Sequence, residues 1–185
     1  MVVEKTLMRL EISSASPEQT RRLGERLGEM VQAGDLICLQ GELGTGKTCF
    51  VQGLGQGLDL SDDVHSPTFI LANEHRGGRL PLYHLDVYRV RNAAEAIGFG
   101  LDDYVSGDAV LVIEWAERIR EALPAEWLWI KFDHRGENAR AIVIEAYGAR
   151  YVELLNAMAR RVNDETISPA PLDEGDREII DAARH

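Results

Sequence analysis

The sequence predicts an α/β fold, a three-layer sandwich with helices on both faces of a mixed, mainly parallel sheet. Short apolar runs typical of buried strands alternate with segments of helical periodicity. A glycine-rich loop joins one such run, "DLICLQ" (35–40), directly to a helix. Two pairs of strand-like runs flank the short turns "RGGR" and "RGEN", which indicates antiparallel hairpins within the sheet.

Each element is placed by its local pattern. Ser16, Pro17 and Gln19 form a helix start of the capping-box type, and Asn92 and Glu95 form a second one. We expect helices over 16–32, from about 46, and over 92–99, 116–123 and 149–162. We expect strands over 6–12, 35–40, 69–75, 80–88, 109–115, 127–134 and 139–147.

The length of 185 residues suits one domain with a tail. Residues 1–162 carry the α/β pattern, whereas 163–185 are acidic and contain two prolines, which predicts a flexible C-terminal tail. The tail holds seven acids and two arginines, so it contributes −5 of the net charge of −11 and leaves −6 for the rest. Neither part has the basic surplus of a nucleic-acid binder, so any RNA is expected to be held by a partner protein.

Nothing in the sequence indicates a membrane or secretory protein. It has no run of eighteen apolar residues and no visible signal peptide, so we expect a cytoplasmic protein. Cys38 and Cys49 lie in apolar segments without metal-ligand spacing, and we expect two buried, reduced thiols. Oligomeric state is not predicted by any pattern found here.

The segment "GELGTGKT" (41–48) matches the phosphate-binding pattern G-x-x-x-x-G-K-[ST]. Its glycines let successive main-chain amides point at phosphate oxygens, and the following helix adds partial positive charge. Lys47 is expected to reach the β- and γ-phosphates, and the Thr48 hydroxyl to bind Mg²⁺. The sequence therefore predicts a P-loop NTPase-like fold. We expect nucleotide contacts from Gly41, Glu42, Leu43, Gly44, Thr45, Gly46, Lys47, Thr48 and Cys49.

Two acids are candidates for the metal and the hydrolytic water. Glu114 follows the apolar run "VLVI", the Walker B form, and Asp86 ends the strand-like run "LPLYHLD". His84 falls on the same strand face as Asp86, so the two residues could form a metal-binding pair, or His84 could be a packed or solvent-facing histidine. Thr68, in the extended segment "HSPTF" (65–69), lies where a nucleotide-sensing loop is expected, and Trp115 is placed either in the core or near the nucleotide.

In this order and at these distances, "GELGTGKT", "SPTF", "HLDVYR" and "IEW" resemble the bacterial TsaE family of tRNA threonylcarbamoyladenosine biosynthesis ATPases. The resemblance covers about residues 6–160. It implies that the protein binds ATP and Mg²⁺ and acts with a TsaB–TsaD assembly, which carries the tRNA. ATP hydrolysis would then reset that assembly between turnovers.

The resemblance also implies residue roles. Lys47, Asp86 and Glu114 would be catalytic, and Thr48, Glu114 and Asp86 would hold the metal. Thr68 would belong to a switch loop, and Trp115 would lie close to the nucleotide. Two departures stand out: Thr45 occupies a position where the family often has alanine, and the acidic tail lies outside the family core.

Two alternatives from other functional classes stay open. A small-molecule or nucleoside kinase would need an arginine-bearing lid, for which 86–108, with Arg89 and Arg91, is the available segment. A nucleotide-gated binding module would need ATP to order 61–70 but would need little catalysis. No N-K-x-D base-reading motif is present, which weakly disfavours GTP, and the choice of ATP comes chiefly from the resemblance.

Overall fold

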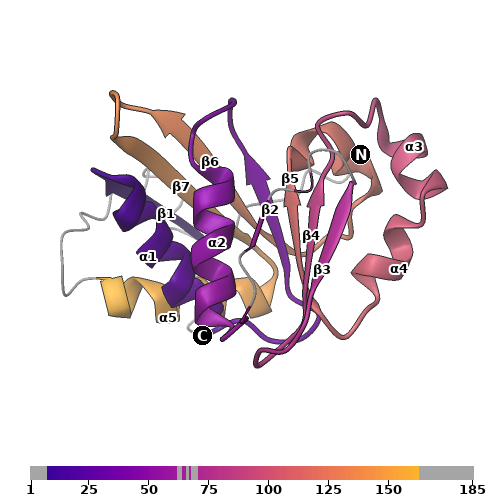
Figure 1. The fold of residues 1–185 in the computed structure, drawn as a ribbon, viewed down its shortest axis with the longest axis horizontal. Coiled ribbons are helices and arrows are strands. Elements are labelled where there is room, and N and C mark those ends of the chain that lie inside the picture. Colours follow the sequence, from indigo (N-terminus) through magenta and orange to yellow (C-terminus); the bar gives the residue numbers. More distant parts are fainter. Residues whose placement is uncertain (1–7, 62–63, 66, 68–70, 163–185) are drawn as a thin grey trace, which may run out of the picture.

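A computed structural model describes residues 8–61, 64–65, 67 and 71–162. Its sheet has seven strands in the order β1-β7-β6-β2-β5-β4-β3 (Figure 1). The strands are β1 (Met8–Ser14), β2 (Leu36–Gln40), β3 (Ala72–His75), β4 (Leu82–Asp86), β5 (Val110–Glu114), β6 (Trp127–His134) and β7 (Arg140–Tyr147). The helices are α1 (Pro17–Gly28), α2 (Lys47–Gly57), α3 (Ala93–Gly98), α4 (Leu101–Val105), α5 (Ala149–Val162) and the 3₁₀ helix η1 (Ala116–Ala122).

The sheet is mixed, as predicted. β6, β2, β5 and β4 are neighbours and pair in parallel, whereas β3 and β7 run against their neighbours. β1 pairs antiparallel with β7 and therefore shares the direction of the four central strands. Five of the seven strands thus point one way, and both predicted hairpins, β3–β4 and β6–β7, are confirmed.

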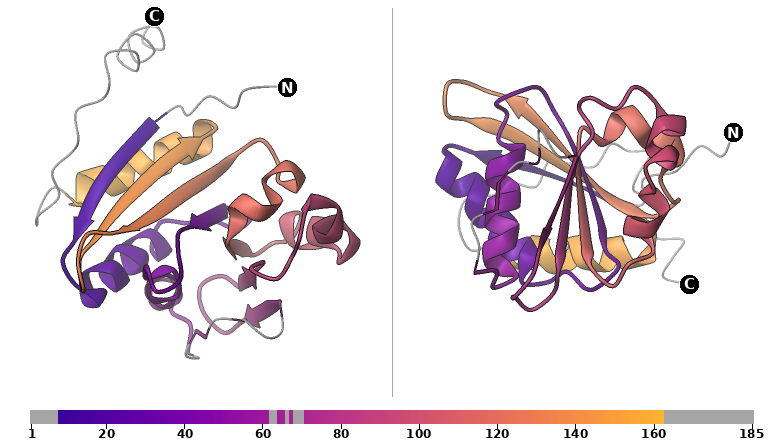
Figure 2. Two further views of the ribbon diagram at one scale, coloured as in Figure 1. Left: turned by 90° about the horizontal axis from the view of Figure 1, so that it is seen from above. Right: turned by 45° about the vertical axis from the view of Figure 1, so that its right-hand side comes forward.

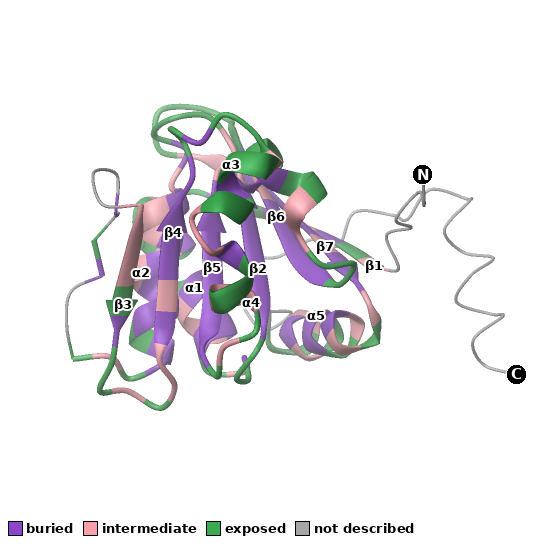
Figure 3. Ribbon diagram, turned by 90° about the vertical axis from the view of Figure 1, so that its right-hand side faces the viewer, coloured by how far each residue is buried: buried purple, intermediate pink, exposed green. Residues whose placement is uncertain are grey.

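Helices cover both faces of the sheet, which confirms the three-layer sandwich. One apolar core packs α1, α2 and α5 against one face, and a second packs α3, α4 and η1 against the other. The right-hand view of Figure 2 shows these layers on either side of the sheet. Figure 3 shows the central strands buried along most of their length and much of the outer surface of α3 and α4 exposed. The buried central strands explain the short, continuous apolar runs in the sequence.

Glycines allow α1 and α2 to pack with their backbones in close approach. A Cβ atom at Gly24 or Gly28 of α1 would clash with the carbonyl oxygens of Phe50 and Leu54, respectively. A Cβ atom at Gly53 of α2 would clash in the same way with the Arg21 carbonyl oxygen of α1. The glycines that weaken α2 as an isolated helix therefore allow its close packing against α1.

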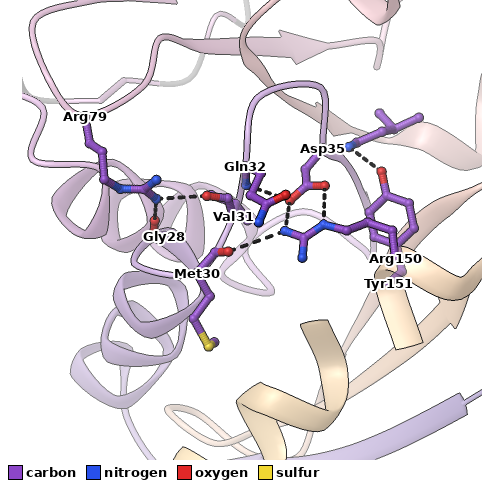
Figure 4. Close-up of polar contacts among 9 residues, drawn as sticks. Gly28, Met30, Val31, Gln32, Asp35, Arg79, Arg150 and Tyr151 are labelled. Atoms are coloured by element: carbon purple, nitrogen blue, oxygen red, sulfur yellow. Dashed lines mark hydrogen bonds and ion pairs between the residues drawn. The ribbon is translucent and has the colours of Figure 1, made fainter. Parts of the chain in front are cut away.

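A polar cluster fixes the amino end of β2, at the edge of the sheet away from the glycine-rich loop (Figure 4). Arg150 of α5 binds both oxygens of Asp35, with Nη2 2.7 Å from Oδ2 and Nε 3.0 Å from Oδ1. Arg79 donates to the carbonyl oxygens of Gly28 and Val31 at 2.6 and 3.0 Å, at the C-terminal end of α1. α1, β2, α5 and the β3–β4 turn are thus tied together.

The structure corrects several predicted elements. The helix predicted over 116–123 is a 3₁₀ helix over 116–122 with a kink at Ile119, and the short helix α4 was not predicted. α1 ends at Gly28, before the predicted 32. Cys38 is buried, but Cys49 is only half-buried; both are thiols. Thr68 and the acidic tail 163–185 lie outside the described residues. Within the described chain, no helix is long and apolar enough to cross a membrane.

Candidate nucleotide-binding site

The glycine-rich loop lies between β2 and α2, as the sequence predicted. The backbone of Gly44 has φ 76° and that of Gly46 has φ 101°, left-handed values that favour glycine. A Cβ atom at Gly41 would lie 2.7 Å from the Phe132 carbonyl oxygen and 2.8 Å from Thr45 Oγ1. The loop therefore needs glycine at these positions to keep its shape.

Lys47 is folded over this loop. Its Nζ donates to the carbonyl oxygens of Gly41 and Glu42, at 2.6 and 2.9 Å, and lies 4.2 Å from the centroid of the Trp115 ring. The residue is only 4% exposed. Burial lowers the pKa of the ammonium, while the nearby carboxylates of Glu114 and others raise it in part. A positive charge is thus held at the loop where a polyphosphate is expected.

Thr48 and Glu114 are brought together from two elements. Thr48 Oγ1 donates to the Glu114 carboxylate, 3.1 Å from Oε1 and 3.3 Å from Oε2. Glu114 is the last residue of β5, adjacent to β2 in the sheet, so the strand order places its carboxylate beside the start of α2. These are the hydroxyl and the Walker B acid that the sequence analysis named as candidate Mg²⁺ ligands.

Asp86 lies beside Glu114 at the ends of two parallel strands. The two residues are register partners in the β4–β5 pair. Asp86 is 8% exposed, and its Oδ1 accepts the main-chain N–H of Tyr88 at 2.9 Å. Both predicted acids thus flank the carboxyl edge of the sheet, where open α/β sheets bind ligands.

Trp115 follows Glu114 in a left-handed conformation with φ 63°, which is unusual for a large side chain. Its ring packs against Tyr88, with centroids 4.9 Å apart. The Arg118 guanidinium lies 5.0 Å from the Tyr88 ring centroid. The Trp115 ring packs against the second core and also contacts Lys47, so it lies between that core and the loop, and its contact with a nucleotide stays a prediction.

Arg140 holds the loop from the other side, and nothing in the sequence singled it out. Its Nε donates to the Thr45 carbonyl oxygen at 3.1 Å, and its Nη2 to that of Gly44 at 3.2 Å. Arg140 begins β7, directly after the turn that follows β6, at the same sheet edge as the loop (Figure 1). A full positive charge therefore supports two carbonyls of the predicted phosphate cradle.

The remaining predicted loop residues differ in exposure. Leu43 is 84% exposed at the tip, whereas Thr45 is 1% exposed and its Oγ1 donates to the Glu42 carbonyl oxygen at 2.8 Å. Cys49 Sγ donates to the Pro17 carbonyl oxygen of α1 at 3.2 Å, and burial raises the pKa of this thiol. The Cys49 side chain is thus engaged with α1, and only its main chain remains as a contact to nucleotide.

The donor set fits Mg²⁺. The Thr48 hydroxyl and the Glu114 carboxylate offer hard oxygen ligands in mutual contact. Mg²⁺ in nucleotide sites is held by one or two such side chains together with phosphate oxygens and water. Among the residues that the structure describes, no group of three or more His, Cys, Asp or Glu side chains is placed to hold a metal by itself. The arrangement therefore suits a metal that arrives with a nucleotide.

The comparisons with known proteins decide the family. The family model for threonylcarbamoyl adenosine biosynthesis protein TsaE matches residues 14–142. The chain belongs to the TsaE family. The crystal structure of Bacillus subtilis YdiB resembles this TsaE-family chain with a TM-score of 0.74 and 36% identity, over 83% of this chain and 96% of that one.

Curated relatives carry the same family name. The tRNA threonylcarbamoyladenosine biosynthesis protein TsaE of Bacillus subtilis is 38% identical over 157 residues, 85% of this chain and 98% of the relative. The protein of the same name from Nostoc is 38% identical over 149 residues, 78% of this chain and 91% of the relative. These relatives confirm the resemblance recognised from the sequence motifs, and the fold agrees with it.

Proposed function

We propose that this protein is a Mg²⁺-dependent ATPase that acts in tRNA threonylcarbamoyladenosine biosynthesis and resets a TsaB–TsaD assembly between turnovers. The observation that carries the proposal is the contact of Thr48 with Glu114, next to Lys47 and Asp86. The family names of the relatives support the pathway.

The chain's own groups have distinct tasks in this proposal. The loop amides and Lys47 bind the phosphates. When nucleotide binds, the Lys47 ammonium gives up its hydrogen bonds to the carbonyl oxygens of Gly41 and Glu42 and donates instead to phosphate oxygens, which are stronger acceptors. Thr48 and Glu114 hold Mg²⁺, which when bound neutralises charge developing on the phosphates. Asp86, whose carboxylate accepts the Tyr88 main-chain N–H, is assigned to orient or deprotonate the attacking water.

Acidic composition fits an indirect role toward tRNA. The chain carries a net charge of −11, so the proposal assigns tRNA binding to the partners. The segment expected to provide a kinase lid instead contains α3 and α4, whose Ala96 and Leu101 are fully buried in the second core. That packing supports hydrolysis over transfer to a small acceptor.

The test is an ATP hydrolysis assay with and without TsaB–TsaD. We expect slow, Mg²⁺-dependent phosphate release by the protein alone and an altered rate with the partners. Lys47→Ala, Asp86→Ala and Glu114→Gln should each lower the rate by at least about tenfold, since charge-stabilising contacts in such sites contribute several kcal/mol. Lys131→Ala removes a lysine from β6 that pairs with Glu145, and serves as the matched control.

Other outcomes separate the alternatives. Phosphate appearing on an added nucleoside or small acceptor, with none released, would establish a kinase. Full support of tRNA modification by Asp86→Ala and Glu114→Gln would establish a binding module in which ATP hydrolysis has no part.

A further inference from the structure

A buried histidine contacts the Walker B acid. His84 of β4 is 0% exposed, and its Nε2 lies 2.8 Å from Glu114 Oε1. Its register partner on β5 is Val112, so the imidazole reaches along the strand pair toward the carboxylate two residues further on. Glu114 is therefore held from two sides, by His84 and by the Thr48 hydroxyl.

The surroundings of His84 assign its tautomer. Nδ1 is buried and has no hydrogen-bond partner among the described residues. A hydrogen on Nδ1 would be a buried donor without an acceptor, which is costly. The arrangement that satisfies the ring is a neutral imidazole with its hydrogen on Nε2, which donates to Glu114.

A neutral donor has a specific consequence for a metal ligand. A lysine or arginine in this place would orient Glu114 but also cancel its negative charge. The imidazole N–H fixes one carboxylate oxygen and leaves the charge of the carboxylate available to a cation. Groups that orient a ligand in this way are common around metal sites and affect metal affinity.

We propose that His84 is a positioning residue for the metal site: its neutral Nε2–H holds the Glu114 carboxylate against Thr48 and preserves its charge for Mg²⁺. The inference rests on the proposed Mg²⁺-dependent nucleotide binding. His84 itself touches neither the nucleotide nor the metal in this proposal, and it acts through Glu114. A purely structural histidine would instead affect folding and all forms of nucleotide binding alike.

The decisive comparison is between His84→Gln and His84→Asn. The glutamine amide extends to the place of Nε2, whereas the asparagine amide corresponds to Nδ1 and falls short of Glu114. ATP affinity is measured by calorimetry over a range of Mg²⁺ concentrations and, separately, in EDTA. We expect His84→Asn to raise the half-saturating Mg²⁺ concentration about tenfold, His84→Gln to restore it to within about threefold, and the EDTA affinity to stay within about twofold in both.

His75→Leu provides the matched control, because it removes the other buried histidine of the β3–β4 hairpin. It should leave the Mg²⁺ dependence unchanged. Equal Mg²⁺ dependence in wild type, His84→Asn and His84→Gln would overturn the inference, as would an equal loss of affinity in EDTA and in Mg²⁺. A wild-type protein that binds no ATP under either condition would overturn the proposed function instead.

A measurement made without nucleotide separates failure of the His84 inference from failure of the proposed function. In a long-range ¹⁵N–¹H NMR spectrum of the histidine rings, the His84 signals are identified by their absence in His84→Gln, and they should be those of a neutral ring with the hydrogen on Nε2. A His84 ring protonated at both nitrogens, or at Nδ1 alone, would overturn the assignment even if the protein hydrolyses ATP.

Discussion

The Lys47 ammonium stands 4.2 Å from the centroid of the Trp115 ring, so the charge expected to meet phosphate also lies against an indole. The same ammonium donates to the carbonyl oxygens of Gly41 and Glu42. Phosphate oxygens compete for those donor hydrogens, because hydrogen bonds between charged groups are the stronger kind. Nucleotide binding is therefore expected to change the environment of Trp115.

We expect tryptophan fluorescence to change on addition of Mg-ATP and the change to come from Trp115. Trp127 and Trp129 are 0% and 1% exposed in the second core and give a constant background. Trp115→Phe should remove the response while binding measured by calorimetry persists. A response that survives Trp115→Phe, or that appears in Lys47→Ala with undiminished size, would contradict this assignment.

Arg140 is predicted to maintain the phosphate loop. Arg140→Met removes the donors to the carbonyls of Thr45 and Gly44, and should weaken ATP binding about tenfold, equivalent to about 1.4 kcal/mol. Arg140→Lys should recover only part of the affinity, because lysine lacks the fork geometry of the guanidinium. Arg9→Met, at a half-exposed arginine of β1, is the control. Unchanged affinity in Arg140→Met would show that the loop keeps its shape unaided.

Local patterns account for much of the fold. Continuous apolar runs located the central strands, glycine-bearing turns located both hairpins, and α5 has the predicted bounds, Ala149–Val162. The capping residues Ser16 and Asn92 accept hydrogen bonds from the main-chain N–H groups of Gln19 and Glu95, as predicted. Each of these features depends on residues that are close in the sequence, so sequence periodicity and spacing carry the information.

Features that depend on the assembled sheet were not predictable in this way. The contact of His84 with Glu114 requires β4 to lie beside β5, and that of Arg140 with Gly44 joins segments 96 residues apart. The 3₁₀ form of η1 follows a left-handed residue, Trp115, and includes a kink at Ile119. Helical periodicity does not distinguish such a segment from an α-helix over two turns.

Replacing a glycine at the α1–α2 contact is predicted to destabilise the protein, although helix propensity alone would predict stabilisation. Gly53→Ala should gain about 1 kcal/mol in helix propensity but clash with the Arg21 carbonyl oxygen, for a net loss of about 2 kcal/mol. Thermal unfolding should then shift down by about 4–8 °C. Gly98→Ala at the end of α3, where a Cβ atom has no neighbour within 4 Å, is the matched control and should not lower the melting temperature. A stabilised Gly53→Ala variant would rule out the close backbone contact.

Tyr151 is predicted to make folding sensitive to alkaline pH. Its hydroxyl accepts the main-chain N–H of Leu36 at 2.7 Å, and burial raises the pKa of Tyr151 well above its usual value near 10 (Figure 4). Above about pH 10 the unfolded chain therefore loses this proton before the folded chain does. The unfolded state then binds fewer protons, so stability is complete below about pH 10 and falls as pH rises toward the folded-state pKa, by up to about 1.4 kcal/mol per pH unit.

Tyr151→Phe separates this titration from the hydrogen bond. At pH 8 the variant should be about 1–2 kcal/mol less stable than wild type in denaturant unfolding, because the Leu36 N–H loses its acceptor. Phenylalanine does not ionise when the chain unfolds, so the difference between the two proteins should narrow as pH rises from 10 to 11. The other tyrosines are common to both proteins and cancel in the difference. A difference that stays constant over this range would show that Tyr151 ionises equally in the folded and unfolded chains.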